Sequence, residues 1–142
     1  MATVCKLYRN APQIIPPNTW TLLTFEKALR NDHGMARDLS LIVPPEDGDF
    51  IWGRNISWET LAIPDGDTRV RQFMARFIRD PWGVRDDTGA EDQVDTPGRD
   101  WDTNIWLFKG PAGVPIGVEV WHDHHEDAIV RHAQFVGQTN DY

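Results

Sequence analysis

Short stretches of the chain alternate apolar and polar residues with the two-residue period of β-strands. The clearest stretch spans residues 50–59, where Phe50, Trp52, Ile56 and Trp58 fall on one face. Proline and glycine recur at short intervals and supply turns between the stretches. We therefore expect an all-β domain, a jelly-roll β-sandwich of about 8–10 antiparallel strands. The pattern predicts strands over residues 18–25, 39–43, 50–59, 68–78, 103–109, 116–123 and 129–136.

Two places in this pattern allow more than one interpretation. Arg54 interrupts the apolar face of residues 50–59, so either the strand bulges at Gly53 or Arg54 is paired inside the domain. Residues 26–38 include Asn31 and Asp32, which favour a loop over a short helix at residues 26–29. We expect a loop there.

Two segments lack clear strand periodicity. Residues 1–17 contain three prolines, and we expect an extended N-terminal arm ahead of a jelly-roll domain of residues 18–142. The alternative is that the arm folds back as an edge strand of its own domain. Residues 80–100 are strongly acidic, and we expect a long surface loop. The residues expected to contact a partner lie in the arm or flank this loop: Val4, Leu7, Tyr8, Ile14, Ile15, Trp82 and Trp101.

Composition narrows the classes of function. The chain has 142 residues, 40% of them hydrophobic, which suffices for one domain with a core. Cys5 is the only cysteine, so no intramolecular disulfide can form. The net charge of −8 repels a phosphate backbone, and the arginines of residues 69–79 fit the solvated face of a strand. Apolar runs fall far short of the roughly 18 residues of a membrane span. We expect neither direct nucleic-acid binding nor membrane association.

Residues 122–127, HDHHED, gather three imidazoles and three carboxylates. His122 and His124 would project to the same side of a strand, and His132 or a carboxylate could complete a metal shell. The same residues fit a polar hairpin tip, which we favour because neither an HExxH motif nor a partner cysteine accompanies them. We therefore predict no metal, no cofactor and no catalytic residue.

Several positions resemble a known family. Residues 17–21 (PNTWT), Phe25, residues 32–35 (DHGM) and residues 42–50 (IVPPEDGDF) follow one another in a characteristic order. This order is similar to the opening half of the trimeric jelly rolls shared by tumour necrosis factor and the complement globular head, especially their bacteriophage relatives. The resemblance spans about residues 14–138. It implies a sandwich that associates as a homotrimer and acts by binding rather than as an enzyme.

The resemblance also implies a role in a virion. We expect a capsid decoration protein of a tailed bacteriophage, which binds the major capsid protein and stabilises the capsid lattice. Such a protein is made in the host cytoplasm and lies on the capsid surface. The first alternative is a receptor-binding tip or tail-fibre head domain, although no stalk precedes the first predicted strand. The second alternative is a metal-dependent jelly-roll enzyme.

Overall fold

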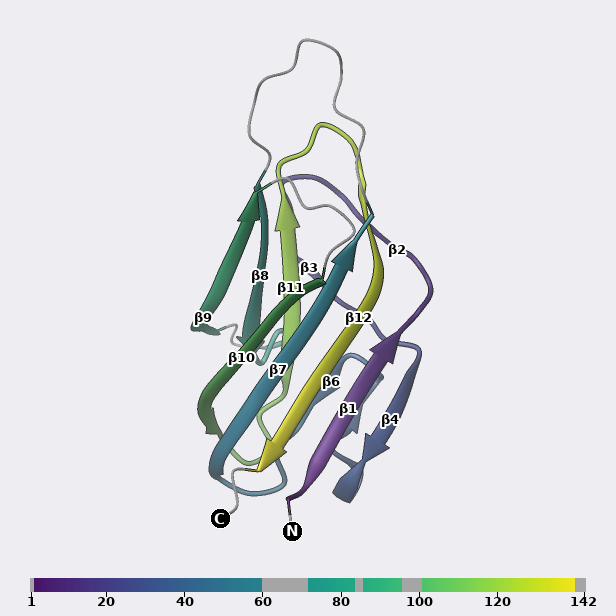
Figure 1. Cartoon of the computed structure of the whole chain (residues 1–142). Coiled ribbons are helices and arrows are strands. Elements are labelled where there is room, and N and C mark those ends of the chain that lie inside the picture. Colours follow the sequence, from purple (N-terminus) through teal and green to yellow (C-terminus); the bar gives the residue numbers. More distant parts are fainter. Residues whose placement is uncertain (1, 60–71, 84–85, 96–100, 140–142) are drawn as a thin grey trace.

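Two antiparallel six-stranded sheets pack face to face, as Figure 1 shows. The computed structural model describes residues 2–59, 72–83, 86–95 and 101–139. This arrangement confirms the predicted jelly-roll β-sandwich. Sheet A has the order β10 (Trp101–Gly110), β7 (Gly48–Trp58), β12 (Ala128–Thr139), β1 (Val4–Arg9) and β4 (Lys27–Asn31), with β2 (Gln13–Ile15) on β12. Sheet B has the order β5 (Ala36–Arg37), β6 (Leu41–Ile42), β11 (Ile116–His122), β8 (Gln72–Arg79) and β9 (Asp86–Asp95), with β3 (Thr21–Leu22) on β11; a short 3-10 turn, η1 (Asp32–Gly34), precedes β5.

The core between the sheets is centred on Trp52 of β7. This side chain is fully buried, and its ring stacks on Phe50 and Phe108 at centroid distances of 5.1 and 5.2 Å. The indole Nε1 donates a hydrogen bond of 3.2 Å to the carbonyl oxygen of Phe108. Gly137 lies opposite on β12, where an added Cβ would be 2.7 Å from Trp52 Cζ3. The indole therefore occupies the space that a side chain at position 137 would need.

Arg54 lies inside the sandwich, as one of the two interpretations predicted. The register between β10 and β7 runs without a shift through Gly53, so no bulge turns Arg54 outward. The side chain is 2% exposed, and its guanidinium lies 4.4 Å from the centre of the Phe77 ring. Nη2 donates to the carbonyl oxygen of Ala75 at 3.3 Å. Contact with an aromatic face and a carbonyl group compensates part of the cost of burying this cation.

The N-terminal residues form an interior strand, and the expectation of an extended arm over residues 1–17 is wrong. β1 pairs with β12 on one side and with β4 on the other, so it is also not an edge strand. Cys5 and Leu7 point inward and are fully buried. The prolines begin only at Pro12, so they leave every backbone N–H of β1 available for pairing.

Two predicted loops contain strands. Within residues 80–100, β9 pairs with β8 at the edge of sheet B, which corrects the long acidic loop. Acidic sequence is compatible with an edge strand, because charge there prevents pairing with other chains. Within residues 26–38, β4 pairs with β1 and forms the edge of sheet A opposite β10. The predicted strand over residues 18–25 is shorter than expected, since only β3 pairs with β11.

Candidate functional site

The outer face of sheet A carries an apolar surface. Ile105 and Leu107 of β10 are 71% and 63% exposed, because the neighbouring Trp106 and Phe108 take the inward positions. Leu107 lies opposite Ile51 of β7, and Ile105 lies opposite Gly53. Large apolar side chains exposed side by side mark an interaction surface more often than scattered single ones. We call the following residues the outer apolar patch: Val4, Ile51, Ile105, Leu107 and Val136, all at least partly exposed on outward positions of the four neighbouring strands β1, β7, β10 and β12.

Basic side chains border this patch on the β1–β4 side. Lys6 lies opposite Val136 on one side and Arg30 on the other. Lys27 Nζ lies 5.4 Å from the centre of the Tyr8 ring, a cation–π distance. Arg30 pairs with Asp32, with 2.8 Å between Nη2 and Oδ2. The face is therefore asymmetric: Ile105 and Leu107 lie on β10, whose exposed Lys109 is opposite Asp49 of β7, whereas three cations gather on β1 and β4.

The predicted partner-binding residues divide into several groups. Val4 and Tyr8 are half-buried on the outer face of sheet A, and Ile14 of β2 is 63% exposed. Leu7 and Ile15 are fully buried in the core, so their predicted contact with a partner is wrong: alternation along β1 and β2 turns them inward. Trp82 is 59% exposed in the turn after β8. Trp101 begins β10, but its side chain lies outside the described residues.

Sequence reasoning missed Ile105 and Leu107. Residues 105–108 read IWLF, so both faces of this strand are apolar. The core of a sandwich covers only one face of such a strand, so its other apolar face is left exposed. That excess was the signal for an exposed apolar surface on this strand.

His122 is a structural residue of the core. Its Nε2 lies 2.7 Å from the carbonyl oxygen of Ile15, and its Nδ1 accepts a hydrogen bond of 3.1 Å from the backbone N–H of His124. Both ring nitrogens are therefore occupied, and the neutral ring carries its proton on Nε2. Burial lowers the pKa of His122 below its ordinary value, which agrees with a neutral ring. In the described part of the chain, no three His, Cys, Asp or Glu side chains are placed to hold a metal ion.

The outer face of sheet B holds an ion pair under an aromatic cover. Glu119 of β11 is almost fully buried and accepts hydrogen bonds from Arg76 Nη2 at 2.9 Å and Nε at 3.1 Å. The Arg76 guanidinium lies 3.8 Å from the centre of the Trp20 ring. Trp20 thus shields the pair from water and links the segment before β3 to sheet B. We assign this arrangement a structural role.

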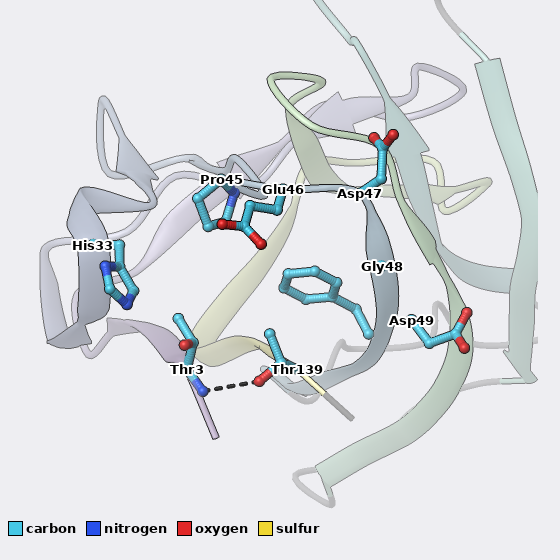
Figure 2. A pocket seen from close by; sticks show the side chains of 9 residues that line it. Thr3, His33, Pro45, Glu46, Asp47, Gly48, Asp49 and Thr139 are labelled. Carbon is cyan, nitrogen blue, oxygen red and sulfur yellow. Dashed lines mark hydrogen bonds between the residues drawn. The ribbon is translucent and has the colours of Figure 1, made fainter. Parts of the chain in front are cut away.

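A pocket of about 320 Å³ opens beside the ends of β1 and β12 (Figure 2). Thr3 and Thr139 lie at one wall, where the Thr3 N–H donates to Thr139 Oγ1 at 2.9 Å. The Glu46 side chain and the His33 imidazole lie at other walls, while Asp47 and Asp49 point away. Asp47 instead accepts a hydrogen bond of 2.7 Å from the Ala112 N–H. Glu46 is therefore the acidic group that faces this pocket.

Known proteins resemble this chain in fold and not in sequence. No family model matches it, and no curated protein is similar in sequence. The globular domain of zebrafish complement 1qA protein superposes with a TM-score of 0.65 at 9% identity, covering 99% of this chain and 98% of that one. Eiger TNF from S. frugiperda gives 0.65 at 7% identity, covering 99% and 94%. Murine APRIL at pH 8.5 gives 0.61 at 14% identity, covering 96% and 98%. The chain therefore shares the fold of TNF-like and complement 1q-like globular domains. No helix among the described residues is long and apolar enough to cross a bilayer.

Proposed function

We propose that this protein is a binding domain without catalytic activity that assembles as a homotrimer through the outer face of sheet A. The exposure of Ile105 and Leu107 within the outer apolar patch carries this proposal. Covering a fully exposed side chain of this size contributes roughly 1.5–3 kcal/mol, so burial of these two residues favours association at each interface. The trimeric state is the one implied by the resemblance of about residues 14–138 to trimeric jelly rolls. The fold shared with TNF-like and complement 1q-like domains agrees with it.

The asymmetry of the face favours a cyclic arrangement. In a two-fold dimer the same surface meets itself, so the patch must be complementary to its own copy. In a three-fold ring, the β10 side of one copy meets a different region of the next copy. An apolar side and a basic side on one sheet suit this second arrangement.

Substitution of Leu107 by Lys tests the proposal. We expect the unmodified protein to have a mass near 49 kDa at micromolar concentration, three times the chain mass of 16.3 kDa, and L107K to have the mass of one chain. Each interface loses an apolar contact and gains a buried charge, which weakens association by at least about 30-fold. Light scattering after size exclusion measures both masses.

Leu39→Lys is the matched control, because Leu39 is 37% exposed in the turn before β6 of sheet B and is not part of the outer apolar patch. This variant should remain trimeric. Circular dichroism verifies that both variants are folded. A monomeric unmodified protein, or a trimeric L107K, contradicts the proposal.

The finer function is also a proposal. We propose that the trimer decorates a tailed-bacteriophage capsid by binding the major capsid protein, with support from the sequence resemblance alone. Electron microscopy of particles from the source tests it. Density on the capsid lattice is expected, while density at a tail tip would favour the receptor-binding alternative. Absence of the protein from purified particles contradicts both.

A further inference from the structure

The ring of His122 joins two segments that are far apart in the sequence. It lies at the end of β11 and contacts the carbonyl oxygen of Ile15 at the end of β2. The backbone carbonyl oxygen of His122 accepts a second bond from this segment, 2.7 Å from the N–H of Asn18. Figure 1 shows β2 beside β12, at the end of the sandwich where β11 and β12 are connected. His122 thus fastens residues 13–18 to that end, together with the pairing of β2 with β12.

The surroundings of the ring are suited to its neutral form. The imidazole is fully buried, stacks on Phe73 at 5.6 Å and meets the edge of Trp58 at 6.2 Å. Among described residues, the titratable groups near the ring are His124, Asp123 and Asp127, all on the connection after β11. Asp123 Oδ1 already accepts a bond of 2.8 Å from the Gln72 N–H. The strands packed on the ring present aromatic and aliphatic groups to it.

We propose that His122 is an acid-sensitive latch that holds residues 13–18 on the sandwich and releases them when its ring is protonated. A proton on Nδ1 would face the His124 N–H, so two donors would meet where one donor and one acceptor now pair. The protonated ring would also place a charge between Phe73 and Trp58. Movement of the ring out of this position lets it reach water, and it breaks the bond to Ile15.

His124 extends the same geometry by one step. Its ring is also buried, and its Nδ1 accepts a bond of 3.2 Å from the Glu126 N–H. The two histidines therefore organise successive residues of the connection in the same way, each with Nδ1 as acceptor. Opening at His122 removes the bond that orients the His124 backbone, so the connection loosens along with residues 13–18.

The direction of the pH dependence follows from proton linkage. In the released state, where the His122 ring reaches water, it titrates near pH 6.5, its ordinary value, whereas the latched ring stays neutral. The released state therefore binds one more proton than the latched state once the pH falls below about 6.5. Its population should rise by up to about tenfold per pH unit, and it should be insensitive to pH above 7.

Hydrogen exchange followed by mass spectrometry tests this latch in the whole protein. After correction for the intrinsic rate, protection of peptides covering residues 13–20 should fall about tenfold between pH 7.5 and pH 5.5. Peptides covering residues 50–58 of β7 should keep their protection over the same range. In His122→Gln the pH dependence of residues 13–20 should disappear. His125→Gln is the matched control, because His125 is exposed on the same connection, and it should behave like the unmodified protein.

Two results overturn the proposal. An equal loss of protection in residues 13–20 and 50–58 means that acid unfolds the whole domain. A pH dependence that persists in H122Q assigns it to another group. If H122Q fails to fold, nitrogen NMR of the unmodified protein decides instead: His122 should show a non-protonated Nδ1 at pH 7.5 and should gain its proton together with the loss of protection. Titration near pH 6.5 with unchanged protection would refute the latch.

Discussion

Substitution of Gly137 by Ala is a direct test of how the core is packed. The new Cβ would lie 2.7 Å from Trp52 Cζ3, 3.1 Å from Cε3 and 3.3 Å from Ile42 Cγ2. Optimal carbon contacts are about 3.5–4.0 Å, so the indole must move by nearly 1 Å. Phe50, Phe108 and Phe135 flank the indole, and its Nε1 is bonded to a carbonyl group. Few directions of movement remain.

Overpacking of this kind costs about 1–3 kcal/mol, and we expect a value near 2 kcal/mol. This value is a net loss: it already includes the gain of about 0.5–1 kcal/mol that alanine otherwise gives over glycine in a strand. Gly48→Ala is the matched control, since a Cβ at position 48 meets nothing within 4 Å. It should be neutral or slightly stabilising.

Urea unfolding at one fixed protein concentration measures both effects. With a slope of about 1–3 kcal/mol per molar urea, the midpoint of G137A should fall by roughly 1 M, while that of G48A stays or rises. Adding Trp52→Phe to G137A should recover part of the loss, because the smaller ring vacates the contact, and the two effects should not be additive. Equal midpoints for G137A and G48A would refute the placement of Trp52 against β12.

Two further predictions concern the buried thiol of β1 and the ion pair on the outer face of sheet B. Burial raises the pKa of the Cys5 thiol to about 12. At pH 8 the folded protein should therefore react with Ellman's reagent at least about 100-fold more slowly than the urea-unfolded protein. A rate typical of a free thiol would contradict the position of Cys5 in β1. Glu119→Ala removes the carboxylate that pairs with the Arg76 guanidinium under Trp20. The free energy of unfolding should therefore fall by about 3 kcal/mol. Glu119→Gln keeps an acceptor and should lose less, so equal thermal shifts for the two variants would show that this hydrogen bonding contributes nothing.

The sequence predicted the strands in which apolar and polar residues alternate. It failed for strands that form because a neighbouring strand pairs with them. β7, β11 and β12 carry mostly apolar residues at their inward positions, and all three formed where expected. β4 reads KALRN, which has no strand periodicity, and it is a strand because β1 offers it an open edge. β9 was assigned to a loop for the same reason: its acidic composition says nothing about the pairing partner that β8 supplies.

The candidate surface was predicted in part. Val4 and Tyr8 were expected to meet a partner, and they do lie on the outer face of sheet A, although in an interior strand rather than an arm. Leu7 could not be separated from them in a short apolar stretch, because the face that each residue takes depends on the register with β12. Ile105 and Leu107 became visible as a surface only once the opposite face of β10 was seen to fill the core.

The position of β12 has a consequence for how this chain folds. β12 is the last of the described strands, yet it lies between β7 and β1, in the middle of sheet A. During synthesis, neither β7 nor β1 can complete its hydrogen bonds until residues 128–139 have left the ribosome. Until then Trp52 and its aromatic neighbours lack their cover, which makes the nascent chain vulnerable to aggregation. Contacts between the first and last strands also give a high contact order, so refolding should take milliseconds to seconds.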